Sequence, residues 1–199
     1  CRDLAPALRV GVNLNESVAG TNGPGCALAE GRPSVVCGSE HFLDEARVFA
    51  CAAVPVRDPY GELVAVLDAS RRHGGHRIGI LEPVALAVRA IENRMMRRIG
   101  GELRLAIHYR PELTDSPMRG LLHFDGDGCL LGANPVARQM LDLPMGEGGG
   151  RLCFETLFEG SMERVWTAGN TPVALSCHGG LQLFCRLEGR PSPRFSGFS

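Results

Sequence analysis

The longest regular pattern of apolar positions in this chain lies between residues 81 and 100. Apolar residues recur there at steps of three and four, the spacing of one face of an α-helix: Leu81, Val84, Val88, Ile91 and Met95. Pro83 suits the first turn of such a helix, and the glycines at 100–101 suit its end. The sequence therefore predicts one helix of about four turns. Its apolar face packs either on the core of its own chain or, through residues 83–98, on the same helix of a second copy.

Strand patterns lie on both sides of this helix. Alternating apolar and polar residues separated by Asp-Pro, Asp-Gly or Gly-Gly turns predict three antiparallel hairpins: 49–56 with 63–69, 120–125 with 129–133, and 172–177 with 181–187. Residues 34–38 and 103–109 are predicted to form further strands.

These elements indicate an α+β fold with two mixed α/β modules. Each module is expected to be an antiparallel sheet flanked by helices, and the central helix joins them. We expect the first module over residues 1–99, a linker with a short strand over 100–115, the second module over 116–188 and a C-terminal linker over 189–199.

Four shorter helical segments are also predicted. They are expected at 26–30, after the glycine-rich turn 20–25; at 40–43, as one helical turn; at 136–141, after the Asn134-Pro135 cap; and within 152–166. A glycine-rich turn before a helix either holds an anion on its backbone N–H groups or is only a turn, and the sequence leaves both open.

Composition excludes several function classes. The net charge is −1 and the pI is about 6.7, so no broad nucleic-acid-binding surface is expected. All 21 basic residues are arginine, which excludes a Walker A loop, a Schiff-base lysine and a kinase-type lysine within this stretch. The apolar runs are too short to span a bilayer and no secretory signal pattern is present, so we expect a cytoplasmic protein. Because Cys1 is not Met, we expect the chain to begin inside a longer one.

The eight cysteines contain no C-x-x-C pair, so they are expected to be small buried hydrophobic residues. A thiol-based redox sensor remains an alternative. His73 and His76 are spaced as two metal ligands, but glycines separate them and no third ligand is near, so no metal site is expected.

A group of motifs in the first module resembles the GAF sensor domain of bacterial enhancer-binding activators of the acetoin-regulator type, which work with sigma-54 RNA polymerase. The resemblance runs in order from residue 11 to 98. It rests on these segments: Gly20-Thr21-Asn22, Gly31-Arg32-Pro33, Glu40-His41-Phe42, Cys51-Ala52-Ala53-Val54-Pro55, Val66-Leu67-Asp68 and Ile91-Glu92-Asn93-Arg94. Most of the strands that precede the GTN stretch in the family are absent, so we expect this domain to be incomplete.

Residues 116–188 resemble the PAS module that follows the GAF domain in that family. The similar segments are the turn Phe124-Asp125-x-Asp127-Gly128 and the helix entry Ala133-Asn134-Pro135-x-Ala137. The ATPase module and helix-turn-helix of the family are absent from these residues. The resemblance therefore implies a sensory region whose output lies in other domains, with no direct nucleic-acid binding and no membrane association of its own.

The resemblance implies that a small effector of unknown identity binds the first module. Its candidate site residues are Thr21, Asn22, His41, Phe42, Phe49 and Cys51. No catalytic residue, metal or cofactor is assigned. Two alternatives remain: a dimerisation scaffold without ligand, and a GAF-fold enzyme that reduces methionine sulfoxide with a cysteine nucleophile, which would need a cation beside the thiol.

Overall fold

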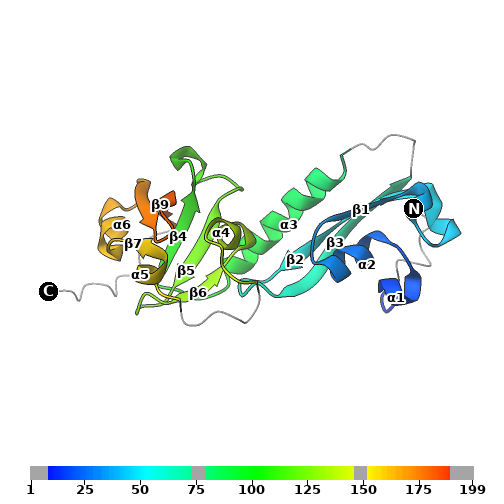
Figure 1. Ribbon diagram of the computed structural model, residues 1–199, viewed down its shortest axis with the longest axis horizontal. Coiled ribbons are helices and arrows are strands. Elements are labelled where there is room, and N and C mark those ends of the chain that lie inside the picture. The colour runs from blue at the N-terminus through cyan, green and yellow to red at the C-terminus, as the bar shows by residue number, and fades with distance from the viewer. Residues whose placement is uncertain (1–8, 73–78, 146–151, 189–199) are drawn as a thin grey trace. The chain divides into compact units, whose positions relative to one another are not determined.

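The computed structural model describes residues 9–72, 79–145 and 152–188, which form two compact units (Figure 1). The first comprises residues 1–56 and 63–88, and the second comprises 57–62 and 89–199. The fold is α+β with antiparallel sheets, as predicted. The predicted histidine pair His73 and His76 and the predicted C-terminal linker lie outside the described residues.

The first unit contains a three-stranded sheet in the order β1-β2-β3. Its strands are β1 (Ser34–Cys37), β2 (Phe49–Arg57) and β3 (Leu63–Arg72). β1 pairs antiparallel with β2, with Val36 opposite Cys51. Only residues 58–62 connect β2 to β3, too short a link for a parallel crossover, so these neighbouring strands form the predicted hairpin.

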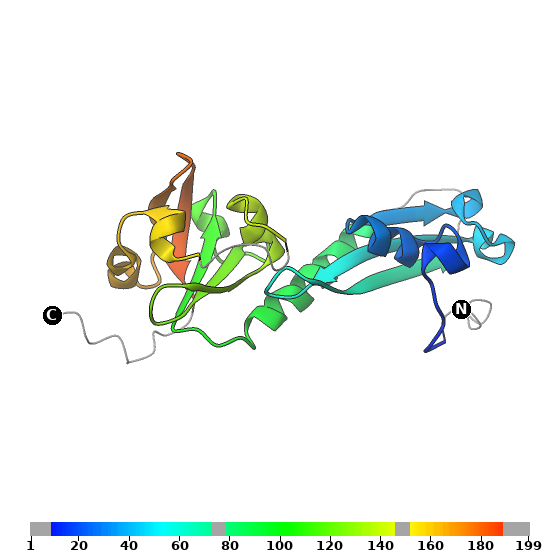
Figure 2. The ribbon, with the colours of Figure 1, turned by 60° about the horizontal axis from the view of Figure 1, so that its bottom comes forward.

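Both faces of this sheet are covered, because Phe49–Val56 of β2 are buried without a break. The helix α2 (Gly23–Glu30) packs on β1 and β3. The short helix α1 (Glu16–Ala19) packs on α2, and both views show the first half of α3 (Leu81–Met96) running alongside the sheet (Figure 2).

The helix α2 ends where the sequence predicts, but it starts three residues earlier than predicted. Asn22 is its N-cap, with Oδ1 accepting a hydrogen bond from the Gly25 N–H at 2.8 Å, and Gly31 follows its last residue at φ +62°. The predicted helical turn at 40–43 is wrong. Two 3₁₀ turns, Gly38–Glu40 and Asp44–Val48, lie on either side of the segment 41–43, and the Glu40 carboxylate accepts the Cys37 N–H at the start of the first turn.

The central helix α3 buries the predicted positions Val84 and Val88 in its first half, but in its second half the buried positions lie one residue beyond the predicted ones. Val84, Val88, Glu92 and Met96 are buried at steps of four, whereas Ile91 is 40% exposed. The buried face of α3 therefore includes the carboxyl group of Glu92, which a search for apolar residues does not predict to be buried. The polar atoms of Glu92 are compensated there, since its Oε1 accepts a hydrogen bond from the Arg57 N–H at 2.9 Å.

The second unit contains a six-stranded antiparallel sheet in the order β6-β5-β4-β9-β8-β7. Its strands are β4 (Leu103–His108), β5 (Gly120–Phe124), β6 (Leu130–Ala133), β7 (Phe158–Glu159), β8 (Val173–Cys177) and β9 (Gln182–Leu187). The short strand predicted within residues 100–115 is confirmed as β4. β4 lies in the middle of the sheet, paired with β5 and β9, because its apolar residues Leu103, Leu105 and Ile107 belong to the core.

Three helices and one 3₁₀ turn complete this unit: α4 (Pro135–Met140), α5 (Phe154–Leu157), α6 (Met162–Ala168) and the turn Pro111–Leu113. The segment 152–166 is not one helix, because Phe158 and Glu159 leave α5 to pair with β8. The core includes Phe124, Phe154 and Phe158. The ring centroid of Phe154 lies 5.9 Å from that of Phe124 and 5.0 Å from that of Phe158. Among residues 9–72, 79–145 and 152–188, no helix is long and apolar enough to cross a membrane.

Candidate functional site

The candidate site is a small cavity in the first unit, between the start of α2, the 3₁₀ turns and the strands β2 and β3. Its volume is about 80 Å³. Apolar and small residues make up most of its wall: Leu14, Ala19, Gly23, Pro24, Leu43, Ala46 and Phe49. The polar side chains on the wall are Thr21, Asn22, His41, Cys51, Asp68 and Ser70. An apolar wall with a few polar groups is typical of a small-molecule site.

Four of these polar side chains form one chain of hydrogen bonds. Ser70 Oγ lies 2.7 Å from Asp68 Oδ2 and 3.1 Å from Cys51 Sγ, and Cys51 Sγ lies 3.3 Å from His41 Nε2. His41 Nδ1 lies 3.1 Å from the Gly38 carbonyl oxygen. Because a carbonyl only accepts, Nδ1 carries a proton and donates to it.

Two arrangements of protons satisfy every bond in this chain. In the ionised one, His41 is an imidazolium whose Nε2–H donates to Cys51, the thiol donates to Ser70, and the hydroxyl donates to the Asp68 carboxylate. In the neutral one, each proton shifts the other way, so Asp68 donates to Ser70, Ser70 to Cys51 and Cys51 to Nε2. The chain therefore links the charge of Asp68 to that of His41.

Burial acts against the charged form of Asp68. It raises the pKa of Asp68, opposed by the Ser70 hydrogen bond and by the His41 charge. Burial also raises the pKa of the Cys51 thiol, which keeps the sulfur protonated and a poor nucleophile. The other carboxyl oxygen, Asp68 Oδ1, is buried without a hydrogen-bond partner. A buried acceptor of this kind favours a ligand that donates a hydrogen bond.

Five of the six residues predicted from the sequence line this cavity: Thr21, Asn22, His41, Phe49 and Cys51. The polar atoms of the Asn22 side chain are already hydrogen-bonded to the backbone of neighbouring segments. Nδ2 donates to the Leu14 and Gly20 carbonyl oxygens, and Oδ1 caps α2. This cap also occupies the glycine-rich turn that could have held an anion.

Phe42 does not line the cavity, and its side chain is 67% exposed. Its ring covers Gly20, where a Cβ would lie 2.3 Å from the Phe42 Cγ. Gly20 has φ +64°, so glycine is favoured there by both the backbone and the ring. Neighbouring side chains of this segment point in opposite directions, so His41 points into the unit and Phe42 points toward solvent.

Asp68 and Ser70 were missed as site residues. The resemblance included Asp68 only as part of a similar segment. Their spacing of two residues on a predicted strand could have indicated that they belong together, since it puts both side chains on the same face of β3.

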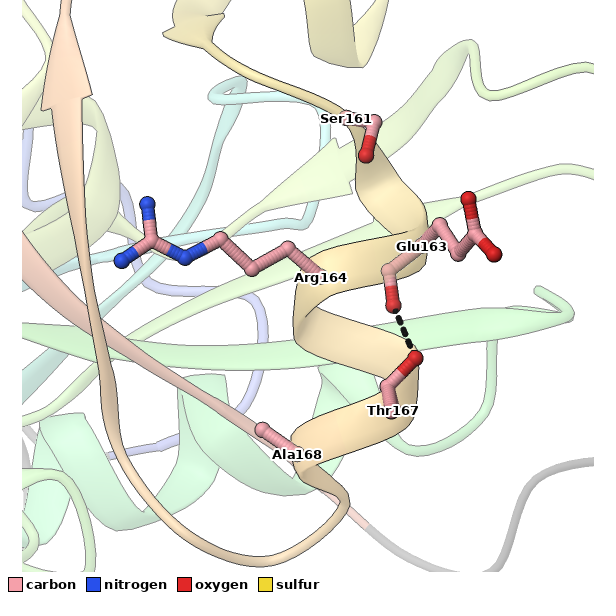
Figure 3. A pocket seen from close by; sticks show the side chains of 5 residues that line it. All are labelled: Ser161, Glu163, Arg164, Thr167 and Ala168. Atoms are coloured by element: carbon pink, nitrogen blue, oxygen red, sulfur yellow. Dashed lines mark hydrogen bonds between the residues drawn. The ribbon is translucent and has the colours of Figure 1, made fainter.

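The cavity offers no metal centre, because within residues 9–72, 79–145 and 152–188 no three His, Cys, Asp or Glu side chains group as metal ligands. A second hollow, of about 510 Å³, lies over α6 and is lined by Ser161, Glu163, Arg164, Thr167 and Ala168 (Figure 3). Thr167 Oγ1 donates there to the Glu163 carbonyl oxygen at 2.8 Å. One helix and its cap form the whole lining, so this hollow is a surface depression.

Comparison with known proteins finds one family model that matches the N-terminal part of the chain. Residues 4–74 match the family described as MimR, N-terminal domain. The acetoin catabolism regulatory protein of Cupriavidus necator is 33% identical over 165 residues, which are 78% of this chain and 25% of that protein. The propane 2-monooxygenase operon transcriptional activator MimR of Mycolicibacterium goodii is 45% identical over 137 residues, 66% of this chain and 22% of that protein.

A third relative is the signal-transduction and transcriptional-control protein of Clostridium beijerinckii, 31% identical over 67% of this chain and 21% of its own length. The chain thus spans only about a fifth to a quarter of these curated relatives. A solved structure of the E. coli DhaR(N)–DhaL complex superposes with a TM-score of 0.44 at 14% identity, covering 92% of this chain and 69% of that one.

The named relatives are regulators of transcription and not enzymes. These comparisons confirm the resemblance that the sequence motifs indicated, to the sensory region of sigma-54-dependent transcriptional activators of the acetoin-regulator type.

Proposed function

We propose that this chain is the signal-sensing region of a bacterial transcriptional regulator and that it binds a small effector in the cavity of its first unit. The observation that carries the proposal is the hydrogen-bonded chain from Asp68 to His41, whose four side chains line the cavity and which leaves one buried carboxyl oxygen of Asp68 without a hydrogen-bond partner. A polar chain of this kind is costly to bury unless something completes it.

The cavity limits the effector to a small, uncharged molecule with a hydroxyl group. The volume of about 80 Å³ equals the share of liquid volume of only two or three water molecules, so an effector of three or four carbons would enter with expansion of the site. The hydroxyl would donate to Asp68 Oδ1 and the carbon atoms would contact Phe49 and Leu43. The names of two relatives refer to acetoin and to a propane 2-monooxygenase operon, and an alcohol or hydroxyketone of three or four carbons has this chemistry.

Binding would change the proton arrangement of the chain. A hydroxyl that donates to Asp68 Oδ1 stabilises the carboxylate and so favours the ionised arrangement, with His41 as the imidazolium. A ligand that prefers one of two arrangements shifts the population toward it. The segment from Gly38 to His41 would then respond to the ligand through the Nδ1–carbonyl hydrogen bond.

In this proposal the first unit is a GAF-like sensor and the second a PAS-like module, and the region controls an ATPase and DNA-binding output carried elsewhere. The region itself does not contact nucleic acid. We also propose a homodimer through helix 83–98, in which the exposed side chains Leu86 and Ile91 would contact the partner; Ile91 belongs to the predicted apolar face and Leu86 does not. Light scattering on Leu86→Asp and the unchanged chain tests this proposal, and equal masses would rule out that face.

Thermal unfolding against a panel of small alcohols, ketones and hydroxyketones tests effector binding. A ligand at about 100 times its Kd adds about 2.7 kcal/mol, which raises Tm by several degrees in a domain of this size. We expect Asp68→Asn to lose most of the shift, because its amide removes the carboxylate that the ligand stabilises. Phe42→Ala is the matched control and keeps the shift, since Phe42 lies outside the cavity.

Two results would contradict this proposal. One is the absence of a Tm shift with every compound although the chain is folded, which would favour the scaffold without ligand. The other is an equal shift in Asp68→Asn and the unchanged chain, which would place binding away from this cavity.

A further inference from the structure

Two cysteines of the second unit, Cys129 and Cys153, lie directly opposite each other. They form an isolated antiparallel bridge, flanked by hydrogen bonds from the Leu130 N–H to the Leu152 carbonyl at 2.7 Å and from the Phe154 N–H to the Gly128 carbonyl at 2.8 Å. This pattern makes the two cysteines a non-hydrogen-bonded pair, the pair type in which opposed side chains are closest.

The sulfur atoms of this pair are in contact. Cys129 Sγ and Cys153 Sγ are 2.8 Å apart. Cα atoms in non-hydrogen-bonded pairs are about 4.5 Å apart, within the range of about 4.4–6.8 Å that a disulfide spans. Backbone movement is therefore not needed to join them. No sequence motif indicates this pair, because the two cysteines lie far apart in the chain and do not form a C-x-x-C motif.

We propose that Cys129 and Cys153 form a reversible disulfide with a low-molecular-weight disulfide as the oxidant. This inference goes beyond effector sensing and does not depend on it. Cys153 is the residue that a small oxidant reaches, since it is partly exposed, whereas Cys129 is buried and 6% exposed. Burial raises the pKa of Cys177 and of Cys185, which keeps both as thiols.

The reaction balances as thiol–disulfide exchange. The Cys153 sulfur, having lost its proton, attacks one sulfur of R–S–S–R; the oxidant's S–S bond breaks and the first R–SH leaves with a proton. The Cys129 sulfur then loses its proton and attacks Cys153 Sγ, the mixed disulfide breaks, and the second R–SH leaves. Two protein thiols are oxidised, losing two electrons and two protons, and one R–S–S–R is reduced to two R–SH.

The disulfide would close the segment between the two cysteines, which contains β6 and α4. Two groups in that segment, the Ala133 N–H and the Arg138 guanidinium, donate hydrogen bonds to the Pro59 carbonyl oxygen. Oxidation would therefore restrict the segment that holds the turn between β2 and β3, within the second unit. A thiol oxidant would act on the regulator there, away from the effector cavity of the first unit.

Peptide mapping after oxidation tests the proposal. The 199-residue chain is incubated with oxidised glutathione, alkylated, digested without reduction and analysed by mass spectrometry. We expect a linked peptide pair that contains Cys129 and Cys153, a loss of two titratable thiols per chain, recovery with dithiothreitol, and a Tm several degrees higher in the oxidised form.

Cys153→Ser is the informative variant, because serine is a good N-cap and the backbone bonds between Cys153 and Thr156 do not need the sulfur. It should lose the linked peptide and the Tm shift, whereas Cys177→Ser, the matched control, should keep both. A stable glutathione adduct on Cys153 without linkage to Cys129, no linked peptide at all, or the same Tm shift in Cys153→Ser would each overturn the proposal.

Discussion

The guanidinium of Arg138 donates a hydrogen bond from Nη2 to the carbonyl oxygen of Pro59 at 3.1 Å, across 79 positions of sequence. The Ala133 N–H donates to the same oxygen at 2.9 Å, and Arg138 Nε donates to the Ala133 carbonyl at 3.2 Å. Arg138 is only 7% exposed. One buried cation thus connects α4, the end of β6 and the turn after β2, which explains why residues 57–62 group with the second unit.

Arg138→Lys should destabilise the second unit by about 2–4 kcal/mol. Lysine keeps the charge but cannot place donors on separate carbonyl groups at the same time, so buried acceptors lose their partners. Urea unfolding measures the loss. Arg164→Lys on α6 is the matched control, since Arg164 is exposed, and should change stability by less than about 0.5 kcal/mol. Equal effects of the two substitutions would show that the Arg138 contacts do not stabilise the fold.

Glu92 should make the chain less stable as pH rises. Burial raises its pKa from 4.5 to about 7, against the lowering effects of the Arg57 N–H and of the Arg57 and Arg89 charges. Because the folded pKa is above the unfolded one, this contribution is fully present below about pH 4.5 and is lost as pH rises through about 7. Burying the carboxylate becomes unfavourable once it ionises.

Unfolding free energies measured from pH 5 to pH 8 check this dependence. Glu92→Gln should remove the decline and be the more stable protein at pH 8, because Gln Oε1 still accepts the Arg57 N–H. Glu163→Gln, at an exposed position of α6, should leave the decline unchanged. If Glu92→Gln declines as steeply as the unchanged chain, the carboxyl group of Glu92 is not the cause.

The same residue shows what limited prediction of the fold. Periodicity located α3 to within a few residues, and turn residues located all three hairpins, because these signals are local. The buried face of α3 was displaced by one position, since Glu92 is buried only because Arg57, distant in sequence, supplies its hydrogen bond. The central place of β4 in the second sheet was not predicted for a related reason: its partners are β5 and β9, and no local pattern specifies that pairing.

His123 should act in the opposite direction to Glu92. Its side chain is 1% exposed in β5, and burial, with a smaller effect of Arg104, lowers its pKa from 6.5 to about 4. Because the folded pKa is below the unfolded one, stability is fully present above about pH 6.5 and is lost as pH falls toward about 4, where the unfolded chain binds the proton more readily.

The two pH effects overlap, so they are best separated in the Glu92→Gln background. Guanidinium unfolding there should show stability falling from pH 7 to pH 5, and adding His123→Leu should flatten that fall. Leucine has a similar volume and no titrating group. An unchanged fall in the double variant would assign the acid sensitivity to other groups.

The candidate site was predictable in part because it is built from short segments. The GTN turn, His41 and the start of β2 all lie within the first unit and carry the resemblance, so five residues of the cavity could be named from sequence. The hydrogen-bonded chain could not, because it depends on Ser70 of β3 facing Cys51 of β2, a relation set by strand pairing. Phe42 does not line the cavity, since a resemblance between sequences carries no information on the direction of a side chain.

Phe49 and Phe42 together give a stability test of this site. Phe49 is 4% exposed and lines the cavity, so Phe49→Ala should cost about 3–4 kcal/mol in unfolding free energy, the usual loss for a buried phenylalanine. Phe42→Ala makes the same change at a side chain that is 67% exposed and should cost less than about 1 kcal/mol. Urea unfolding of both variants gives the comparison. A larger loss of unfolding free energy in Phe42→Ala than in Phe49→Ala would contradict this prediction. It would mean that the Phe42 ring over Gly20 stabilises the first unit more than the cavity residue Phe49 does.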